Sequence, residues 1–138
     1  MRAKEFLQKA YRIDQRINSK LEQIVSLRNL ATKATYTVSD NPVKGTKNVH
    51  RMEDIIIKMV DLENEINQDV DSLVDLKRSM VTVIKKVSDP ELQTLLELRY
   101  LCFKTWEEIA IEMNYGIDNI FRLHRHALQK ITVIQAVQ

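Results

Sequence analysis

The chain has 138 residues, enough for one ordinary domain or for a small domain with an extended helical arm. Charged residues make up 29% and aromatic residues only 6%, and the apolar content is mainly leucine, isoleucine, valine and methionine, which is typical of helices. The start of the chain carries charges every few positions and no apolar run approaches the roughly 20 residues that span a bilayer. With the single cysteine, Cys102, these features predict a cytoplasmic protein without a signal peptide or membrane partner.

Residues 1–34 are predicted to form one long basic helix, beginning near residue 3. Its apolar residues alternate at spacings of three and four, interrupted by Lys20. These residues are Phe6, Ala10, Ile13, Ile17, Ile24, Leu27 and Ala31, with Leu21 alongside. Lysine and arginine outnumber acidic residues by five in this stretch.

Residues 35–48 lose the helical pattern and are rich in Thr, Ser, Asp, Asn, Pro and Gly. This composition predicts a flexible loop, either functional or disordered.

Residues 49–89 are predicted to form a second long helix with heptad periodicity. Apolar residues recur every seven positions, at Met52, Met59, Ile66, Leu73, Met80 and Val87. The companion heptad position holds Ile55, Leu62, Leu76 and Val83, with Asp69 as the exception and Val70 as its expected substitute. The helix is acidic between Glu53 and Asp75, and Asp89-Pro90 is expected to end it.

The opposite charges of the two helices predict that they pair as an antiparallel coiled-coil hairpin. The basic helix could instead lie along DNA or an acidic membrane surface, but pairing with the acidic helix is the simpler interpretation. The regular heptad seam also favours a homodimer.

Residues 90–138 show the spacing of a helix-turn-helix domain, so the predicted fold class is all-α. An apolar pattern through Trp106, Ile109 and Met113 breaks at Asn114-Tyr115-Gly116 and then restarts. Thr105 followed three residues later by Glu108 predicts a capping box, and Gly116 is expected to provide conformational freedom in the turn.

The last helix is predicted to turn an apolar stripe of Ile120, Leu123, Ala127 and Ile131 toward its scaffold. Polar and cationic side chains opposite this stripe are candidate DNA contacts, with Arg122 and Arg125 the strongest because either could reach a guanine edge or a phosphate. The full candidate set is Lys104, Thr105, Ile117, Asp118, Asn119, Phe121, Arg122, Arg125, His126 and Lys130. Asn119 could pair with adenine, and Asp118 could accept from cytosine or only complement the helix dipole.

Catalytic and metal-binding patterns are not found in the sequence. His124 and His126 face different sides of a helix and, with Cys102, do not have metal-ligand spacing. Adjacent Glu107 and Glu108 point apart, as surface charges do. We therefore expect neither an enzyme nor a cofactor.

The stretches LELRYLCFKTWEEIA and HRHALQKI resemble the fourth conserved region of bacterial sigma factors. The whole chain, including MRAKEFLQKA and VDLKRSM, is similar to small regulators of phages and prophages of low-GC Gram-positive bacteria, near the ArpU-like late-gene regulators. Sigma recognition helices usually open with Ser and Arg, whereas this helix opens Gly116-Ile117-Asp118-Asn119, and Phe121 stands where Arg is common. The base-reading residues therefore cannot be copied from sigma factors.

The resemblance implies a sequence-specific transcription regulator, a phage or prophage late-gene activator acting with host RNA polymerase in the bacterial cytoplasm. Double-stranded DNA would be its main partner. The alternative is an interaction module whose hairpin binds RNA polymerase or another regulator without direct base readout.

Overall fold

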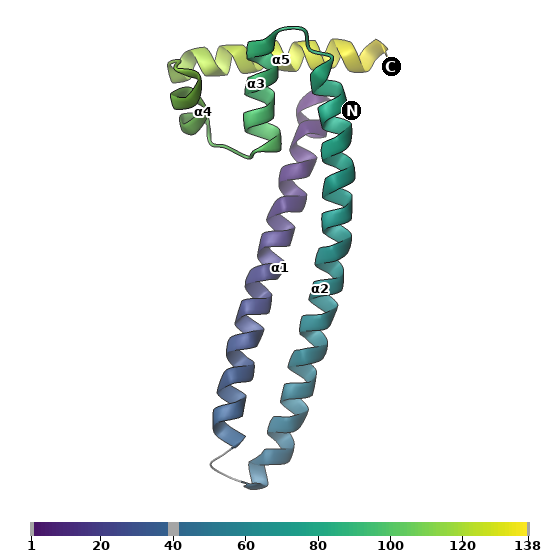
Figure 1. The fold of residues 1–138 in the computed structure, drawn as a ribbon, viewed down its shortest axis with the longest axis vertical. Helices are drawn as coiled ribbons and strands as arrows, with labels where there is room; N and C mark the ends of the chain where they lie inside the picture. Colours follow the sequence, from purple (N-terminus) through teal and green to yellow (C-terminus); the bar gives the residue numbers. More distant parts are fainter. Residues whose placement is uncertain (1, 39–41, 138) are drawn as a thin grey trace. The chain divides into compact units, whose positions relative to one another are not determined.

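The computed structural model describes residues 2–38 and 42–137, with side chains at 2–33 and 49–137, and this part of the chain is helical without strands (Figure 1). The predicted all-α class is confirmed. The elements are α1 (Ala3–Val38), α2 (Pro42–Lys85), α3 (Pro90–Leu96), the π-helical turn η1 (Glu97–Leu101), α4 (Trp106–Met113) and α5 (Ile117–Val137). None of the described helices is both long enough and apolar enough to cross a membrane.

The chain divides into two compact units, and both long helices contribute to each. Unit 1 comprises Met1–Ile13 and Ser72–Gln138, and unit 2 comprises Asp14–Asp71. The segment predicted as a helix-turn-helix domain therefore shares its unit with the first turns of α1 and the last turns of α2.

In unit 2, α1 from Asp14 onward and α2 up to Asp71 lie side by side (Figure 1). The predicted seam positions are the ones withdrawn from solvent: Ile17 and Ile24 are buried on α1, while Met59, Leu62 and Ile66 are partly buried on α2. Positions between them on α2 are exposed. The spacing of apolar residues thus identified the inward face of both helices.

Asp69 corrects the prediction that Val70 replaces it at the seam. Asp69 is partly buried and Val70 is 40% exposed. The Nζ atom of Lys20, the residue that interrupts the apolar pattern of α1, lies 2.7 Å from Oδ2 of Asp69. The ammonium group of Lys20 and the carboxylate of Asp69 neutralise each other. Both charged side chains can therefore remain at the seam.

The predicted loop at residues 35–48 is wrong for most of its length. Helix α1 continues to Val38 and α2 already begins at Pro42. Proline is compatible with the first turn of a helix because it has no N–H group to satisfy there, and Thr or Val costs only a few tenths of a kcal/mol per residue. Residues 39–41 of the predicted loop lie outside the described residues.

Unit 1 has one apolar core to which several elements contribute. Its largest fully buried side chains are Leu7, Met80, Ile84, Val87, Leu95, Leu96, Ile109, Ile120 and Ile131. Leu7 comes from the first turns of α1. The sequence pattern predicts these turns as part of the hairpin and gives no sign that they join this core. At about 1.5 to 3 kcal/mol for each fully buried aliphatic side chain, this core supplies the main stabilisation of unit 1.

Helix α2 ends at Lys85, slightly before the expected break at Asp89-Pro90, and α3 starts at Pro90. Oδ1 of Asp89 accepts a hydrogen bond from the backbone N–H of Glu91 at 2.9 Å, which caps α3. The side-chain amide of Gln93 donates to the carbonyl of Val87 at 2.6 Å. These bonds fix the connection between α2 and α3.

Candidate nucleic-acid interface

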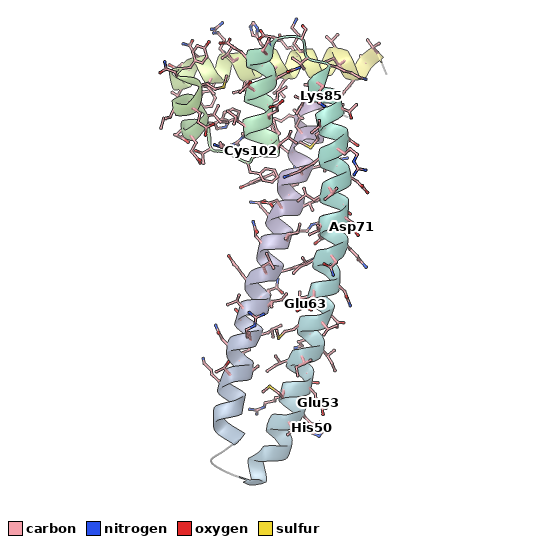
Figure 2. All side chains as sticks on the ribbon, in the orientation of Figure 1. His50, Glu53, Glu63, Asp71, Lys85 and Cys102 are labelled. Atoms are coloured by element: carbon pink, nitrogen blue, oxygen red, sulfur yellow. The ribbon has the colours of Figure 1, made fainter. Side chains whose placement is uncertain are left out.

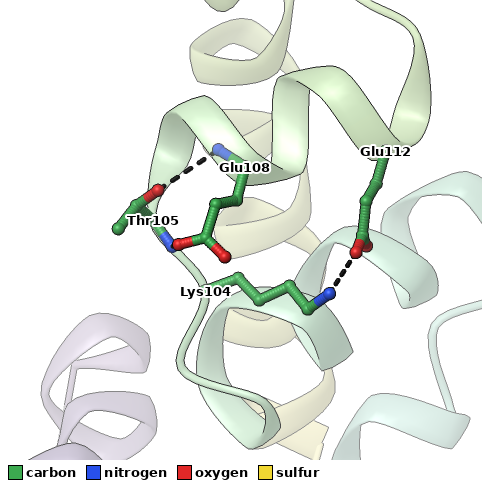
Figure 3. A network of polar contacts seen from close by, with 4 residues as sticks. All are labelled: Lys104, Thr105, Glu108 and Glu112. Carbon is green, nitrogen blue, oxygen red and sulfur yellow. Dashed lines mark hydrogen bonds and ion pairs between the residues drawn. The ribbon is translucent and has the colours of Figure 1, made fainter.

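The start of α4 is fixed by the capping box that the sequence predicts (Figure 3). The Thr105 hydroxyl accepts from the Glu108 N–H at 3.2 Å, and the Glu108 carboxylate accepts from the Thr105 N–H at 3.3 Å. The Thr105 hydroxyl is therefore already engaged in capping.

Lys104 does not present a free positive charge. Its Nζ forms an ion pair and a hydrogen bond with Glu112 on the last turn of α4 (Figure 3). The hydrogen bond to Glu112 raises the pKa of Lys104 above its ordinary value. Sequence spacing alone did not indicate this partner, eight residues away.

The turn between α4 and α5 contains Asn114, Tyr115 and Gly116. Asn114 has φ of 60° and ψ of 45°, so Asn114 is the left-handed residue that ends α4. Gly116 does not have a positive φ, which corrects its predicted role. Its carbonyl accepts from the Ile120 N–H at 3.1 Å, so Gly116 stands at the N-cap of α5.

Tyr115 ties the turn to α3. Its hydroxyl donates to the carboxylate of Glu91, and this hydrogen bond raises the pKa of Tyr115. Because Glu91 lies in the first turn of α3, the contact joins the start of α3 to the turn before α5.

Helix α5 has one buried face and one exposed face. Ile120, His124, Ala127 and Ile131 are buried against the core. Eight of the ten candidate DNA contacts are exposed on this helix: Ile117, Asp118, Asn119, Phe121, Arg122, Arg125, His126 and Lys130. The structure thus brings most of the predicted site onto one helix, while Lys104 and Thr105 stand at the start of α4.

His124 is a core residue and not part of the exposed face. Its side chain is only 8% exposed, and its Nε2 atom lies 2.5 Å from the hydroxyl of Tyr100. Burial lowers the pKa of His124 to about 4, with Lys4 and Arg99 adding to the effect, and burial raises the pKa of Tyr100 to about 12. At neutral pH the imidazole is therefore neutral and the phenol keeps its proton.

Trp106 links α4 to α5 through ring contacts. Its ring meets His124 at 4.6 Å and Phe121 at 5.5 Å between centroids, both edge to face. Phe121 is 39% exposed, so part of its ring packs against Trp106 and only the remainder faces solvent. These contacts hold α5 against α4 and orient its outer face.

Arg99 and Phe103, absent from the predicted site, hold the segment before α4. The Arg99 guanidinium lies 4.3 Å from the centroid of the Trp106 ring and donates to the Lys104 carbonyl at 2.9 Å. Phe103 has φ of 58°, an unfavourable conformation for an aromatic residue. It is held by the Tyr11 ring at 5.6 Å and by Lys77 Nζ at 4.7 Å from its centroid.

Metal-ligating side chains do not gather in the described part of the chain. No group of three or more His, Cys, Asp or Glu is arranged there to hold a metal ion, and Cys102 is an exposed free thiol.

The described structure is thus that of an all-helical protein whose last helix is anchored by one face and carries arginine, histidine and lysine on the other. The chain belongs to the family described as "protein of unknown function (DUF1492)", which matches residues 30–132. This match includes α3 and α4 and most of α5. Neither a curated protein nor a solved structure matches the chain.

Proposed function

We propose that the protein is a sequence-specific DNA-binding transcription regulator. In this proposal α4, the turn and α5 act as a helix-turn-helix of the sigma-region-four type, and in the chain they follow a long antiparallel helical hairpin. The resemblance to phage and prophage regulators further suggests a homodimeric late-gene activator that works with host RNA polymerase in the bacterial cytoplasm. No cofactor or catalytic step is part of the proposal.

The observation that carries the proposal is the outer face of α5. A helix that enters the major groove must be fixed on one side and offer side chains that can donate to bases and phosphates on the other. Ile120, His124 and Ile131 provide the fixed side, and Arg122 and Arg125 stand exposed on the opposite side. Three residues between α4 and α5 match the short turn of such motifs.

The charge of unit 1 also supports the proposal. Residues 91–138 carry five lysines and arginines against six acidic residues, which alone is a poor balance for DNA binding. Unit 1 as a whole carries thirteen lysines and arginines against nine acidic residues, because the first turns of α1 and the end of α2 belong to it. A basic excess favours association with phosphates.

The test is selection of bound fragments from random genomic DNA at about 0.15 M salt, followed by salt titration on any recovered motif. If Arg122 and Arg125 read bases, the Arg122→Ala/Arg125→Ala protein should no longer enrich the motif. If both residues contact phosphates, the slope of log affinity against log salt should become less steep by about two. The matched control is Arg16→Ala/Arg51→Ala, which removes the same charge from exposed positions of unit 2.

Equal effects of the two double variants would contradict base reading by α5. If the wild-type protein enriches no motif but binds purified RNA polymerase, the alternative function holds, and the helical hairpin is an interaction module. Circular dichroism on each variant separates loss of contact from loss of fold.

A further inference from the structure

Unit 2 has exposed apolar side chains that do not belong to its seam. Leu21 and Val25 on α1, and Ile56, Val60 and Val70 on α2, are between 40% and 53% exposed. On each helix they lie one and four positions after seam residues such as Ile17, Met59 and Ile66, which places them in a second stripe beside the seam. We call these five residues the apolar face.

The two stripes lie on the same side of unit 2. A groove of about 570 Å³ runs between α1 and α2, and its lining includes Ser19, Gln23 and Ser26 from one helix and Lys58, Asp61 and Glu65 from the other. On both helices these groove residues lie on the flank of the seam opposite to the stripe, at 100° per residue. Unit 2 therefore has on one side a groove whose lining also includes the seam residues Leu27 and Leu62, and the apolar face on the other.

We propose that the apolar face binds a second copy of this chain, so that two hairpins form a four-helix bundle. The inference deepens the proposed function, which includes a homodimer, by naming the surface that would form it. A single hairpin of two helices buries only the seam between them. In a bundle of four helices, the stripe beside each seam is covered as well.

Charge determines how the two copies are arranged. A two-fold axis within the interface can place α1 on α1 and α2 on α2, or each α1 on the partner's α2. Between Asp14 and Lys33, α1 carries four basic and two acidic residues; between Val49 and Asp71, α2 carries two basic and seven acidic residues. Like-on-like stacking would set two acidic helices against each other, so α1 packs on the partner's α2.

Charged side chains beside the apolar face favour the packing of α1 on the partner's α2. Glu53 and Glu63, labelled in Figure 2, are exposed on α2. At 100° per residue they lie on either flank of the stripe that holds Ile56 and Val60. On α1, Arg28 follows Leu21 and Val25 at the matching spacing. In the proposed bundle the arginine of one copy approaches the glutamates of the other at the rim, where opposite charges favour the register. The two-fold axis runs along the helices, so both copies of α2 leave the bundle at the same end.

The first test measures mass in solution by light scattering on the full chain. The wild-type protein should be a dimer at micromolar concentration, and Leu21→Glu/Val60→Glu should weaken self-association at least about 100-fold by placing carboxylates in the interface. The matched control, Leu30→Glu/Ile57→Glu, replaces residues that are 50% and 58% exposed but lie outside the apolar face, and it should remain dimeric. A monomeric wild type, a dimeric face variant or a monomeric control overturns the proposal.

The second test does not depend on how well the charged variants fold. In a Cys102→Ser background, Val25→Cys and Val60→Cys proteins are mixed and treated with a short bismaleimide cross-linker. The mixture should give several-fold more cross-linked dimer than either protein alone, because the proposed arrangement puts α1 on the partner's α2. More product from the separate proteins than from the mixture, or no product in any sample, overturns the arrangement.

DNA binding separates this proposal from the proposed function. A monomeric face variant that still binds DNA through Arg122 retains the function and loses only the dimer. A wild-type dimer that binds no DNA supports the apolar face and contradicts the regulator.

Discussion

Lys20 and Asp69 meet across the seam of unit 2, with Nζ and Oδ2 2.7 Å apart and side-chain exposures of 21% and 16%. Each interrupts the apolar pattern of the seam on its helix. A partly buried ion pair of this kind costs desolvation and adds little net stability, but it penalises any register in which either charge loses its partner. We infer that the pair sets how α1 and α2 align.

A double-mutant cycle at this pair should therefore be strongly non-additive. Asp69→Leu should lower the free energy of unfolding by about 1 to 3 kcal/mol, because it leaves the Lys20 ammonium partly buried without its partner. Lys20→Met/Asp69→Leu should be as stable as the wild type or more stable. Urea unfolding of the four proteins measures the coupling, and additive effects would show that the pair does not act as a unit.

The turn before α5 gives a second prediction. Asn114 is in the left-handed region, so Asn114→Gly should be tolerated, whereas Asn114→Ala should lower the free energy of unfolding by about 1 kcal/mol. Gly116 is an N-cap, and a Cβ atom added there would meet nothing within 4 Å, so Gly116→Ser should raise stability by a few tenths of a kcal/mol. Thermal unfolding of the three variants checks the assignment. Destabilisation by Gly116→Ser with tolerance of Asn114→Ala would reverse it.

Periodicity was sufficient to identify the long helices and their inward faces. Ile17 and Ile24 on α1, and Met80 and Val83 on α2, are all buried where the seven-residue spacing predicted. The capping box of Thr105 was equally predictable, because its two bonds join residues three positions apart. Such features depend on neighbours within one helix, and the sequence displays those directly.

Features that depend on distant partners were not predictable from the sequence. The sequence pattern predicts that Asp69 is excluded from the seam, because its partner, Lys20, lies 49 positions away and is not visible from local spacing. Leu7 joins the core of unit 1 across more than 70 residues of intervening chain. The positive φ of Phe103 also has no local signal, since an aromatic side chain does not favour it.

The ion pair between Lys104 and Glu112 gives a third prediction, about DNA binding. Glu112→Gln removes the carboxylate that holds the Lys104 ammonium, so Lys104 becomes available for a phosphate. The affinity for DNA should rise, and the slope of log affinity against log salt should steepen by about one. Glu107→Gln is the control, because it removes the same charge from an exposed position of α4 that has no ion pair to Lys104. Identical titrations for the two variants would mean that only net charge matters and that Lys104 makes no contact.

The buried pair of Tyr100 and His124 gives a prediction for pH. Burial lowers the pKa of His124 to about 4 in the folded protein, whereas an unfolded histidine titrates near its ordinary value of 6.5. Below about pH 6.5 the unfolded chain binds a proton that the folded chain does not, so the free energy of unfolding should fall as the pH falls from 6.5 toward 4. The loss from this residue is about 2 to 3 kcal/mol over that range.

His124→Gln isolates this effect, because glutamine keeps a polar group near the Tyr100 hydroxyl but does not titrate. Urea unfolding at intervals between pH 7 and pH 4 should show a shallower decline for the variant than for the wild type. His126→Gln, on the exposed side of α5, is the matched control and should follow the wild type. Because α5 is anchored through His124 and Trp106, protonation of this imidazole should also loosen the outer face of the helix, and DNA binding by the wild type should weaken together with stability. Parallel curves for the wild type and His124→Gln would show that His124 has the same pKa in the folded and unfolded protein, which contradicts the lowered pKa.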